Sequence, residues 1–148
     1  MKDINLNLFQ HKIKLNVRFM DLDAMHHVNN ARYLNFLEES RIAYSQEVLQ
    51  QFNDIKSFNA VVARIEIDYL RPIQFGEEVA VYTRVSKIGT KSFHFESVIT
   101  TENNEGYAIA AKAHQALVNI DIKSGKSDAI PMDIRKKIEE FEGKPLET

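Results

Sequence analysis

The sequence predicts an α+β domain in which a five-stranded antiparallel sheet packs against one long helix. Five segments alternate apolar and polar residues with a period of two, which is typical of half-buried strands. A single long segment repeats its apolar residues every three or four positions, as an amphipathic helix does. The chain has 148 residues and no Pro- or Gly-rich linker, so we expect one domain over residues 1–148.

The first strand and the long helix come early in the chain. Residues 11–19 are predicted to form a strand whose apolar face consists of Ile13, Leu15, Val17 and Phe19. After a polar loop, residues 30–50 carry a helical stripe made of Tyr33, Leu37, Ser40, Tyr44 and Val48. Asn29 or Asn30 can cap this helix by accepting a hydrogen bond from a backbone N–H of its first turn.

Four further strands and a short helix follow. Alternation predicts strands over residues 61–71, 78–86, 92–100 and 107–120. The last of these strands is rich in alanine, and small side chains suit a sheet that curls around a helix. Pro131 opens a short helix over about 131–141, whose apolar residues are Ile134, Ile138 and Phe141. Because such a sheet has edge strands that can pair with a second copy, we expect a homodimer or homotetramer.

The composition argues against several classes of function. The formal net charge is -2 and the cations are scattered, so we expect no nucleic-acid partner. No apolar run approaches the roughly 18 residues that span a bilayer, and the first residues lack the apolar core of a signal peptide. The sequence has no cysteine, which removes disulfides and thiolate chemistry. We therefore expect a cytoplasmic protein that does not associate with membranes.

The segment DLDAMHHVNNARYLNF, residues 21–36, concentrates titratable side chains directly before the helix. His26 and His27 are adjacent and point apart in an extended chain, so we expect no metal site. His94 and His114 fall within predicted strands, where structural or surface roles are expected. The sequence contains no Gly-x-Ser-x-Gly elbow and no glycine-rich phosphate loop, which argues against a serine hydrolase and a nucleotide-phosphate site.

Two carboxylates in this segment remain as candidates for catalysis. Asp21 and Asp23 lie between the end of a strand and the start of the helix. A carboxylate there can act as a general base on water or attack an activated acyl carbon, while backbone N–H groups at a helix start stabilise an oxyanion. The alternative is that both residues form Asx turns or interact with the helix dipole. Spacing alone does not choose between the two aspartates.

The stretch LDAMHHVNNARYLNFLEESR resembles the signature of the hotdog-fold acyl thioesterases of the 4-hydroxybenzoyl-CoA thioesterase type. It is most similar to the branch that acts on long-chain fatty acyl-CoA, through Asp23, the run HVNN and Tyr33. The resemblance covers roughly residues 10–135 and includes the hairpin TKSFHFE. It implies a hotdog fold, in which the sheet wraps around the long helix. It also implies two subunits that join their sheets and share paired active sites.

The resemblance also implies roles for individual residues. Asp23 matches the catalytic carboxylate of the family, as a general base or a nucleophile. Asn30 is expected to cap the helix, and His27 or Asn29 to position Asp23 or its water. The backbone N–H of Ala60 falls where the family polarises the thioester carbonyl.

Other residues are expected to contact the remainder of the substrate. Tyr33 is expected in the core or in the wall of an acyl tunnel. Candidates for contacts with the phosphates of CoA are Lys91, Lys87, Lys126, Arg64 and Arg71. The resemblance therefore predicts an acyl-CoA thioesterase that releases a free fatty acid and CoA without a metal or an organic cofactor. Two alternatives stay open: an acyl-carrier-protein thioesterase, and a non-catalytic hotdog protein that binds acyl-CoA.

Overall fold

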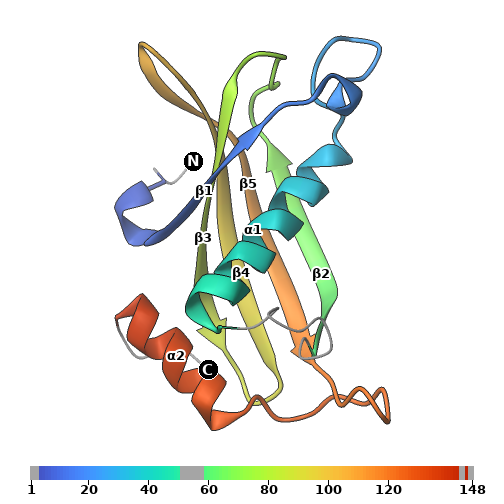
Figure 1. Cartoon of the computed structure of the whole chain (residues 1–148), viewed down its shortest axis with the longest axis vertical. Coiled ribbons are helices and arrows are strands. Elements are labelled where there is room, and N and C mark those ends of the chain that lie inside the picture. Colours follow the sequence, from blue (N-terminus) through green and yellow to red (C-terminus); the bar gives the residue numbers. More distant parts are fainter. Residues whose placement is uncertain (1–3, 51–58, 144–145, 147–148) are drawn as a thin grey trace.

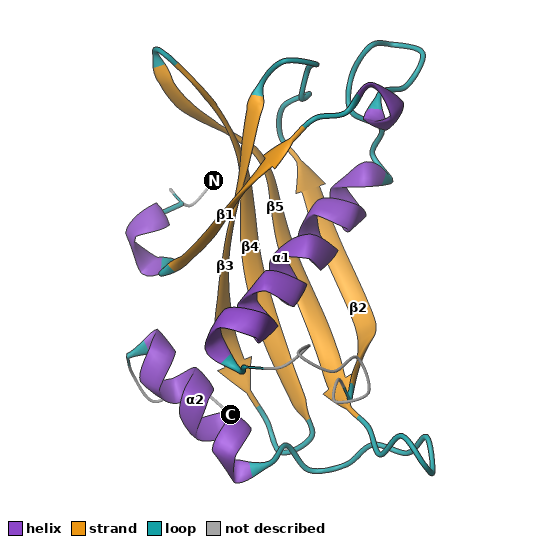
Figure 2. Cartoon of the chain, in the orientation of Figure 1, coloured by secondary structure: helices purple, strands orange, loops and turns teal. Residues whose placement is uncertain are grey.

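A single sheet and two α-helices make up residues 4–50, 59–143 and 146, the part of the chain that the computed structural model describes (Figure 1). The strands are β1 (His11–Asn16), β2 (Ala60–Tyr69), β3 (Glu78–Ile88), β4 (Ser92–Asn103) and β5 (Gly106–Asn119). The helices are α1 (Arg32–Val48) and α2 (Met132–Glu142). Two 3₁₀ turns, Leu6–Leu8 and Phe19–Asp21, flank β1 (Figure 2).

The sheet has the order β1-β3-β4-β5-β2, and all of its neighbouring strands are antiparallel. The long helix α1 lies diagonally across one face of the sheet, and α2 lies beside its C-terminal end (Figure 1). This arrangement confirms the predicted α+β hotdog fold. It leaves β1 and β2 as the edge strands of the described sheet.

The first strand ends earlier than predicted. β1 stops at Asn16, and Phe19 begins a 3₁₀ turn with 81% of its surface exposed, so its placement on the inner face was wrong. The Arg18 backbone N–H donates to Asp21 Oδ2 at 2.8 Å, and the Asp21 N–H donates to the Arg18 carbonyl at 2.9 Å. These two bonds close a tight turn, which competes with continuation of the strand.

The start of α1 also differs from the prediction, because Asn30 does not cap it. The N-cap residue is Ala31, which has no side-chain acceptor, and the helix begins at Arg32. Asn29 instead supports the approach to the helix. Its Oδ1 accepts the N–H of Ala31 at 2.9 Å, and its backbone carbonyl accepts the N–H of Arg32 at 2.8 Å. An Asx turn therefore precedes α1 in place of an asparagine cap.

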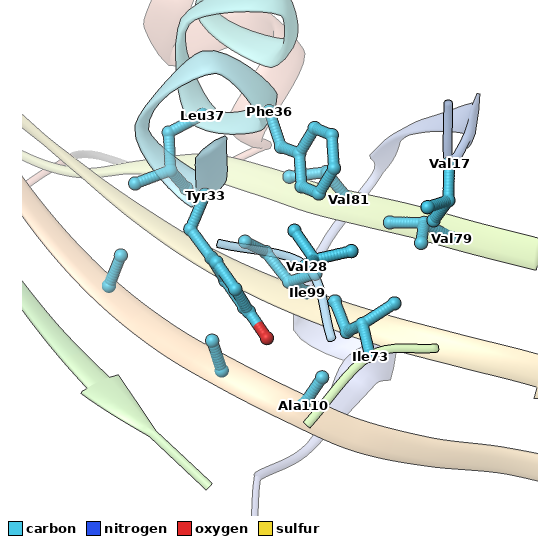
Figure 3. Close-up of a cluster of buried hydrophobic side chains, with 12 residues drawn as sticks. Val17, Val28, Tyr33, Phe36, Leu37, Ile73, Val79, Val81, Ile99 and Ala110 are labelled. Atoms are coloured by element: carbon cyan, nitrogen blue, oxygen red, sulfur yellow. The ribbon is translucent and has the colours of Figure 1, made fainter. Parts of the chain in front are cut away.

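The core lies between α1 and the inner face of the sheet. Figure 3 shows side chains of the first turns of α1 facing β3, β4 and β5; the labelled residues from these elements are Tyr33, Phe36, Leu37, Val79, Val81, Ile99 and Ala110. Ala110 and Ala111 of β5 are fully buried. Their small side chains leave room for the Tyr33 ring, as expected for the alanine-rich strand (Figure 3). A second cluster joins the end of α1 to α2 through Tyr44, Val48, Phe95 and Ile138.

A buried polar network also joins α1 to the sheet. Ser40 and Thr83 share a hydrogen bond of 2.6 Å, and Thr83 and Ser97 share one of 2.9 Å. Gln115 Nε2 donates to Ser97 Oγ at 3.0 Å, and its Oε1 accepts a bond from the Arg41 guanidinium. Because buried polar groups are costly unless they are paired, this network fixes one orientation of α1 on the sheet.

Candidate active site

The loop before α1 is a small hairpin that carries Asp23. Leu22 and Val28 form an antiparallel bridge at its base. The Asp23 N–H donates to the His27 carbonyl at 2.8 Å, and the His26 N–H donates to the Asp23 carbonyl at 3.0 Å. His26 closes the turn in the left-handed region, with φ of 64°. Asp23 thus stands at the mouth of a tight turn whose backbone is hydrogen-bonded on both sides.

The two aspartates of this segment lie in different environments. Asp23 is exposed, and its Oδ1 accepts the N–H of Met25 at 2.9 Å, which is the Asx turn considered from the sequence. Asp21 is 1% exposed and is held by arginine side chains. An exposed carboxylate can meet a substrate, whereas a buried, fully paired one cannot reach it. Burial and exposure therefore distinguish two residues that spacing left equivalent.

The surroundings of Asp21 hold it in the ionised form. Burial alone would raise the pKa of Asp21, but hydrogen bonds from the Arg18 side chain and backbone lower it. The charges of Arg18 and Arg32 act in the same direction, so the pKa of this carboxyl lies below its ordinary value. Asp21 is consequently a fixed anion at neutral pH.

A cleft of about 370 Å³ opens beside the Asp23 hairpin. Five of the residues expected to contact the substrate or to act on it line this cleft together with Tyr69, namely Asp23, His27, Asn30, Tyr33 and Arg71. Asn29 supports the chain entering α1 and is absent from the described lining. The fold thus brings the end of β2 against the loop that precedes α1.

Tyr69 also lines this cleft, although no role was expected for it from the sequence. Its hydroxyl donates to the Asn30 carbonyl at 3.0 Å, and its ring meets the Tyr33 ring edge to face at 4.9 Å. Tyr33 is 3% exposed, and burial raises the pKa of its hydroxyl. Tyr33 therefore belongs to the core and forms the inner wall of the cleft. The only sequence signal for Tyr69 is its place on the apolar side of the alternation in residues 61–71, three residues before Pro72.

Ala60 lies far from Asp23 within the protomer. β2 runs over ten residues from Ala60 to Tyr69, which corresponds to roughly 30 Å of extended chain. Tyr69 lines the Asp23 cleft, whereas Ala60 lines a separate hollow with Phe93 and Ile134 at the opposite end of the sheet. One protomer therefore does not bring the Ala60 N–H to the Asp23 carboxylate.

The candidate CoA-binding cations fall into two groups. Lys91 and Lys126 are exposed near the Ala60 end, where the Lys91 carbonyl accepts the N–H of Asn119 at 2.8 Å. Lys87 is exposed on β3 in register with His94. The other two are arginines of β2 and of the segment that follows it.

Both arginines already have carboxylate partners. Arg64 is exposed and forms an ion pair with Glu66. Arg71 donates to Thr101 Oγ1 at 2.6 Å and to Glu77 Oε1 at 2.9 Å, at the edge of the Asp23 cleft. Arg71 therefore lies at the Asp23 cleft and is separated from the lysines by the length of the sheet.

Other histidines are placed away from this cleft. His94 Nδ1 and His114 Nε2 lie 3.3 Å apart on the neighbouring strands β4 and β5. Burial, with the nearby charges of His114 and Lys87, lowers the pKa of His94.

Among the described residues no three His, Asp or Glu side chains are grouped as ligands for one metal ion. Neither described helix has the length and apolar character needed to cross a membrane.

Comparison with known proteins places the chain in a family. The pattern of the Thioesterase-like superfamily matches residues 17–138. The long-chain acyl-CoA thioesterase FadM of Escherichia coli is 36% identical over 130 residues, which are 86% of this chain and 96% of FadM. The acyl-acyl carrier protein thioesterase ATL2 of Arabidopsis thaliana is 30% identical over 69% of this chain and 55% of its own length.

Solved structures agree with this assignment. A thioesterase from Thermus thermophilus, crystallised with coenzyme A and zinc, superposes with a TM-score of 0.82 at 38% identity. The superposition covers 93% of this chain and 98% of that protein. With a family pattern that spans most of the sequence and a shared hotdog fold, this chain belongs to the Thioesterase-like superfamily of thioester hydrolases.

Proposed function

We propose that this enzyme hydrolyses fatty acyl-CoA to a free acid and CoA, with Asp23 as the reacting carboxylate. The observation that carries the proposal is the exposed Asp23 side chain on the cleft beside the start of α1. The 36% identity to FadM supports acyl-CoA as the substrate. The proposed reaction needs no metal or organic cofactor, because a thioester carbonyl is only weakly stabilised by resonance.

Two routes are open to Asp23. As a general base, it would take a proton from water while the water oxygen attacks the thioester carbon. As a nucleophile, its carboxylate oxygen would form a mixed anhydride that water then hydrolyses. In both routes the carbonyl oxygen becomes an oxyanion, the carbon–sulfur bond breaks, and the CoA thiolate leaves and takes up a proton. Backbone N–H groups would stabilise the oxyanion.

The position of Ala60 implies that a second subunit completes the site. Antiparallel pairing of two β2 edges, centred between Arg64 and Ile65, would bring Ala60 of the partner subunit opposite Tyr69. Val61 and Val62 on this edge are 45% and 44% exposed, and such pairing would cover them. The exposed lysines near Ala60 would then approach the cleft of the neighbouring subunit. We therefore propose a homodimer, or a homotetramer built from two such dimers.

The decisive experiment measures hydrolysis across acyl-CoA substrates of varied chain length and aromatic acyl groups. The wild-type enzyme should hydrolyse fatty acyl-CoA, and Asp23→Asn should lose about 10²- to 10⁴-fold in kcat. Asp133→Asn, which changes an exposed aspartate in the first turn of α2, is the matched control and should retain activity. Full turnover by folded Asp23→Asn would refute the assignment of Asp23.

The same assay separates the alternatives. ATL2 is an acyl-carrier-protein thioesterase by name, so acyl carrier protein thioesters belong in the panel. A higher kcat/KM for acyl carrier protein than for CoA would reassign the thiol carrier. Tight acyl-CoA binding without hydrolysis of either carrier would indicate a non-catalytic binding protein.

The remaining parts of the proposal have their own tests. Dialysis against EDTA should leave the rate unchanged if no metal takes part. Cell fractionation should recover the protein in the cytoplasm, away from membranes. Gel mobility with nucleic acids should show no binding, as the net charge of -2 predicts.

A further inference from the structure

Asp21 is buried two residues before Asp23 and contacts two arginine side chains. Its Oδ2 accepts the Arg18 backbone N–H at 2.8 Å and lies 3.4 Å from Arg18 Nε. Its Oδ1 accepts Arg18 Nη2 at 3.0 Å and lies 3.8 Å from Arg32 Nε. Oδ2 is thus bonded to Arg18, which precedes the Asp23 hairpin, whereas Oδ1 also faces Arg32, which follows it.

The backbone of Asp21 closes the same hairpin. Its carbonyl accepts the N–H of Asn29 at 2.8 Å, just outside the bridge between Leu22 and Val28. The Asp21 N–H donates to the Arg18 carbonyl at 2.9 Å, which ends the 3₁₀ turn. The backbone of Asp21 therefore closes the base of the hairpin formed by residues 22–28. The Asp21 side chain is immobilised by burial and by its charged partners.

The charges around Asp21 explain why a carboxylate is needed there. Arg32 is the first residue of α1, where a cation is unfavourable because the helix N-terminus carries a partial positive charge. Arg18 brings a second cation to the same carboxylate. Without the Asp21 anion, the guanidinium groups of Arg18 and Arg32 would repel each other and the positive end of the helix dipole. Each arginine would then shift, and the backbone to which it is attached would shift with it.

We infer that Asp21 is a positioning residue that acts through Asp23. It holds the hairpin so that the Asp23 carboxylate faces the cleft, while Asp21 itself stays out of reach of the substrate. This inference rests on the proposed role of Asp23, and it assigns the two aspartates different tasks in one reaction. A displacement of about 1 Å at a reacting group can cost on the order of 100-fold in rate, so the expected effect is large.

The first test replaces Asp21 by the isosteric asparagine. Asp21→Asn should lower kcat on palmitoyl-CoA by about 10- to 100-fold, with KM within about threefold of wild type. Circular dichroism should show a folded protein at the assay temperature, and Asp133→Asn serves again as the exposed control. Wild-type kcat in Asp21→Asn would overturn the inference.

A double variant distinguishes positioning from a general loss of structure. If Asp21 acts through Asp23, the variant Asp21→Asn/Asp23→Asn should be no slower than Asp23→Asn alone. If Asp21 only supports the fold, the two losses should multiply, and the inference fails. Rescue offers a second check: Asp21→Glu keeps the charge and should recover part of the kcat lost in Asp21→Asn.

Hydrogen exchange tests the inference independently of activity. The Asn29 amide, bonded to the Asp21 carbonyl, should exchange faster in Asp21→Asn, and so should the other amides of residues 22–29. The sheet amides of β4 should keep wild-type exchange. If the wild-type enzyme hydrolyses no acyl-CoA, the proposed function fails, and the exchange data alone decide on Asp21. Unchanged exchange across the hairpin would overturn its positioning role.

Discussion

The hydroxyl of Tyr69 donates to the backbone carbonyl of Asn30 across 3.0 Å and so joins the end of β2 to the start of α1. Asn30 precedes the N-cap of α1, and Tyr69 and Asn30 both line the Asp23 cleft. Because β2 is an edge strand, this bond would transmit a shift of that edge to the loop that carries Asp23.

The Tyr69–Asn30 bond gives a first prediction. Tyr69→Phe removes the donor but keeps the ring against Tyr33, so we expect the free energy of unfolding to fall by about 0.5–1.5 kcal/mol. We expect kcat for acyl-CoA to fall severalfold, because Asn30 is no longer held at the cleft. Urea denaturation and steady-state kinetics measure the two effects. Tyr107→Phe, at a tyrosine that is 59% exposed, is the control. Equal behaviour of both variants would contradict the prediction.

A second prediction concerns the turn at His26. Its φ of 64° lies in the left-handed region, which costs a non-glycine residue about 1–2 kcal/mol. His26→Gly removes this strain but adds chain entropy to the unfolded state, so we expect a net gain of about 0.5–1 kcal/mol in stability. Ala24→Gly lies in the same loop outside the positive-φ region and should lose about 0.5–1 kcal/mol. Urea denaturation measures the free energy of unfolding of both variants. A loss of stability in His26→Gly similar to that in Ala24→Gly would contradict the prediction.

Much of the fold was predictable because its signals are local. The long helix and the strands have periods that any short window of sequence displays, and α1, β3, β4 and β5 lie within a few residues of the predicted ranges. The boundaries that were wrong depend on side-chain competition. Phe19 continues the alternation of β1, but the carboxylate of Asp21 turns the chain before it. No pattern of apolar residues reports that bond.

The site was less predictable, because its parts meet only in the folded chain. Asp21 and Asp23 have the same chemistry and nearly the same place in the sequence, and only the contacts of Arg18 and Arg32 separate them. Tyr69 reaches Asn30 because β2 lies at the edge of the sheet beside α1, and strand order is a non-local property. The resemblance to a thioesterase family favours Asp23 as the catalytic candidate, but it does not identify Tyr69 as a residue of the cleft.

A third prediction concerns the pH dependence of stability through His11. This ring is 1% exposed and packs edge to face on Tyr44, and Glu47 lies 3.1 Å from its Nε2. Burial lowers the pKa of His11 below 6.5, although the Glu47 charge acts in the opposite direction. The unfolded chain therefore binds a proton more readily than the folded chain. The resulting contribution to stability is present above pH 6.5 and is lost as the pH falls through the folded-state pKa.

Removal of this ionisation should flatten the pH profile. We expect His11→Phe to show a smaller fall in the free energy of unfolding between pH 7 and pH 5 than wild type, measured by urea denaturation at each pH. His94 also has a lowered pKa and should retain its own contribution in this variant. Tyr107→Phe, at an exposed position, serves as the control and should keep the wild-type slope. A His11→Phe profile as steep as wild type would exclude His11 as the source.

A fourth prediction concerns Glu142, whose side chain links α2 to α1 and β3. Its Oε1 accepts the Tyr44 hydroxyl at 2.7 Å and the Val85 backbone N–H at 3.0 Å, so one carboxylate joins α2, α1 and β3. Tyr44 is fully buried, and burial together with the Glu142 charge raises the pKa of its hydroxyl, which therefore stays a donor. Loss of the acceptor would leave this donor unpaired in the core.

Glu142→Ala should therefore lower the free energy of unfolding by about 2–3 kcal/mol, since a buried unpaired donor costs about 1–3 kcal/mol and a second bond is lost as well. Glu142→Gln keeps an acceptor oxygen and should lose less, about 1 kcal/mol. Glu140→Ala changes an exposed glutamate of the same helix and should stay within about 0.5 kcal/mol of wild type. Urea denaturation gives all three values. Because α2 lies at the opposite end of α1 from Asp23, kcat should be unchanged in Glu142→Gln under conditions where the protein is folded (Figure 1).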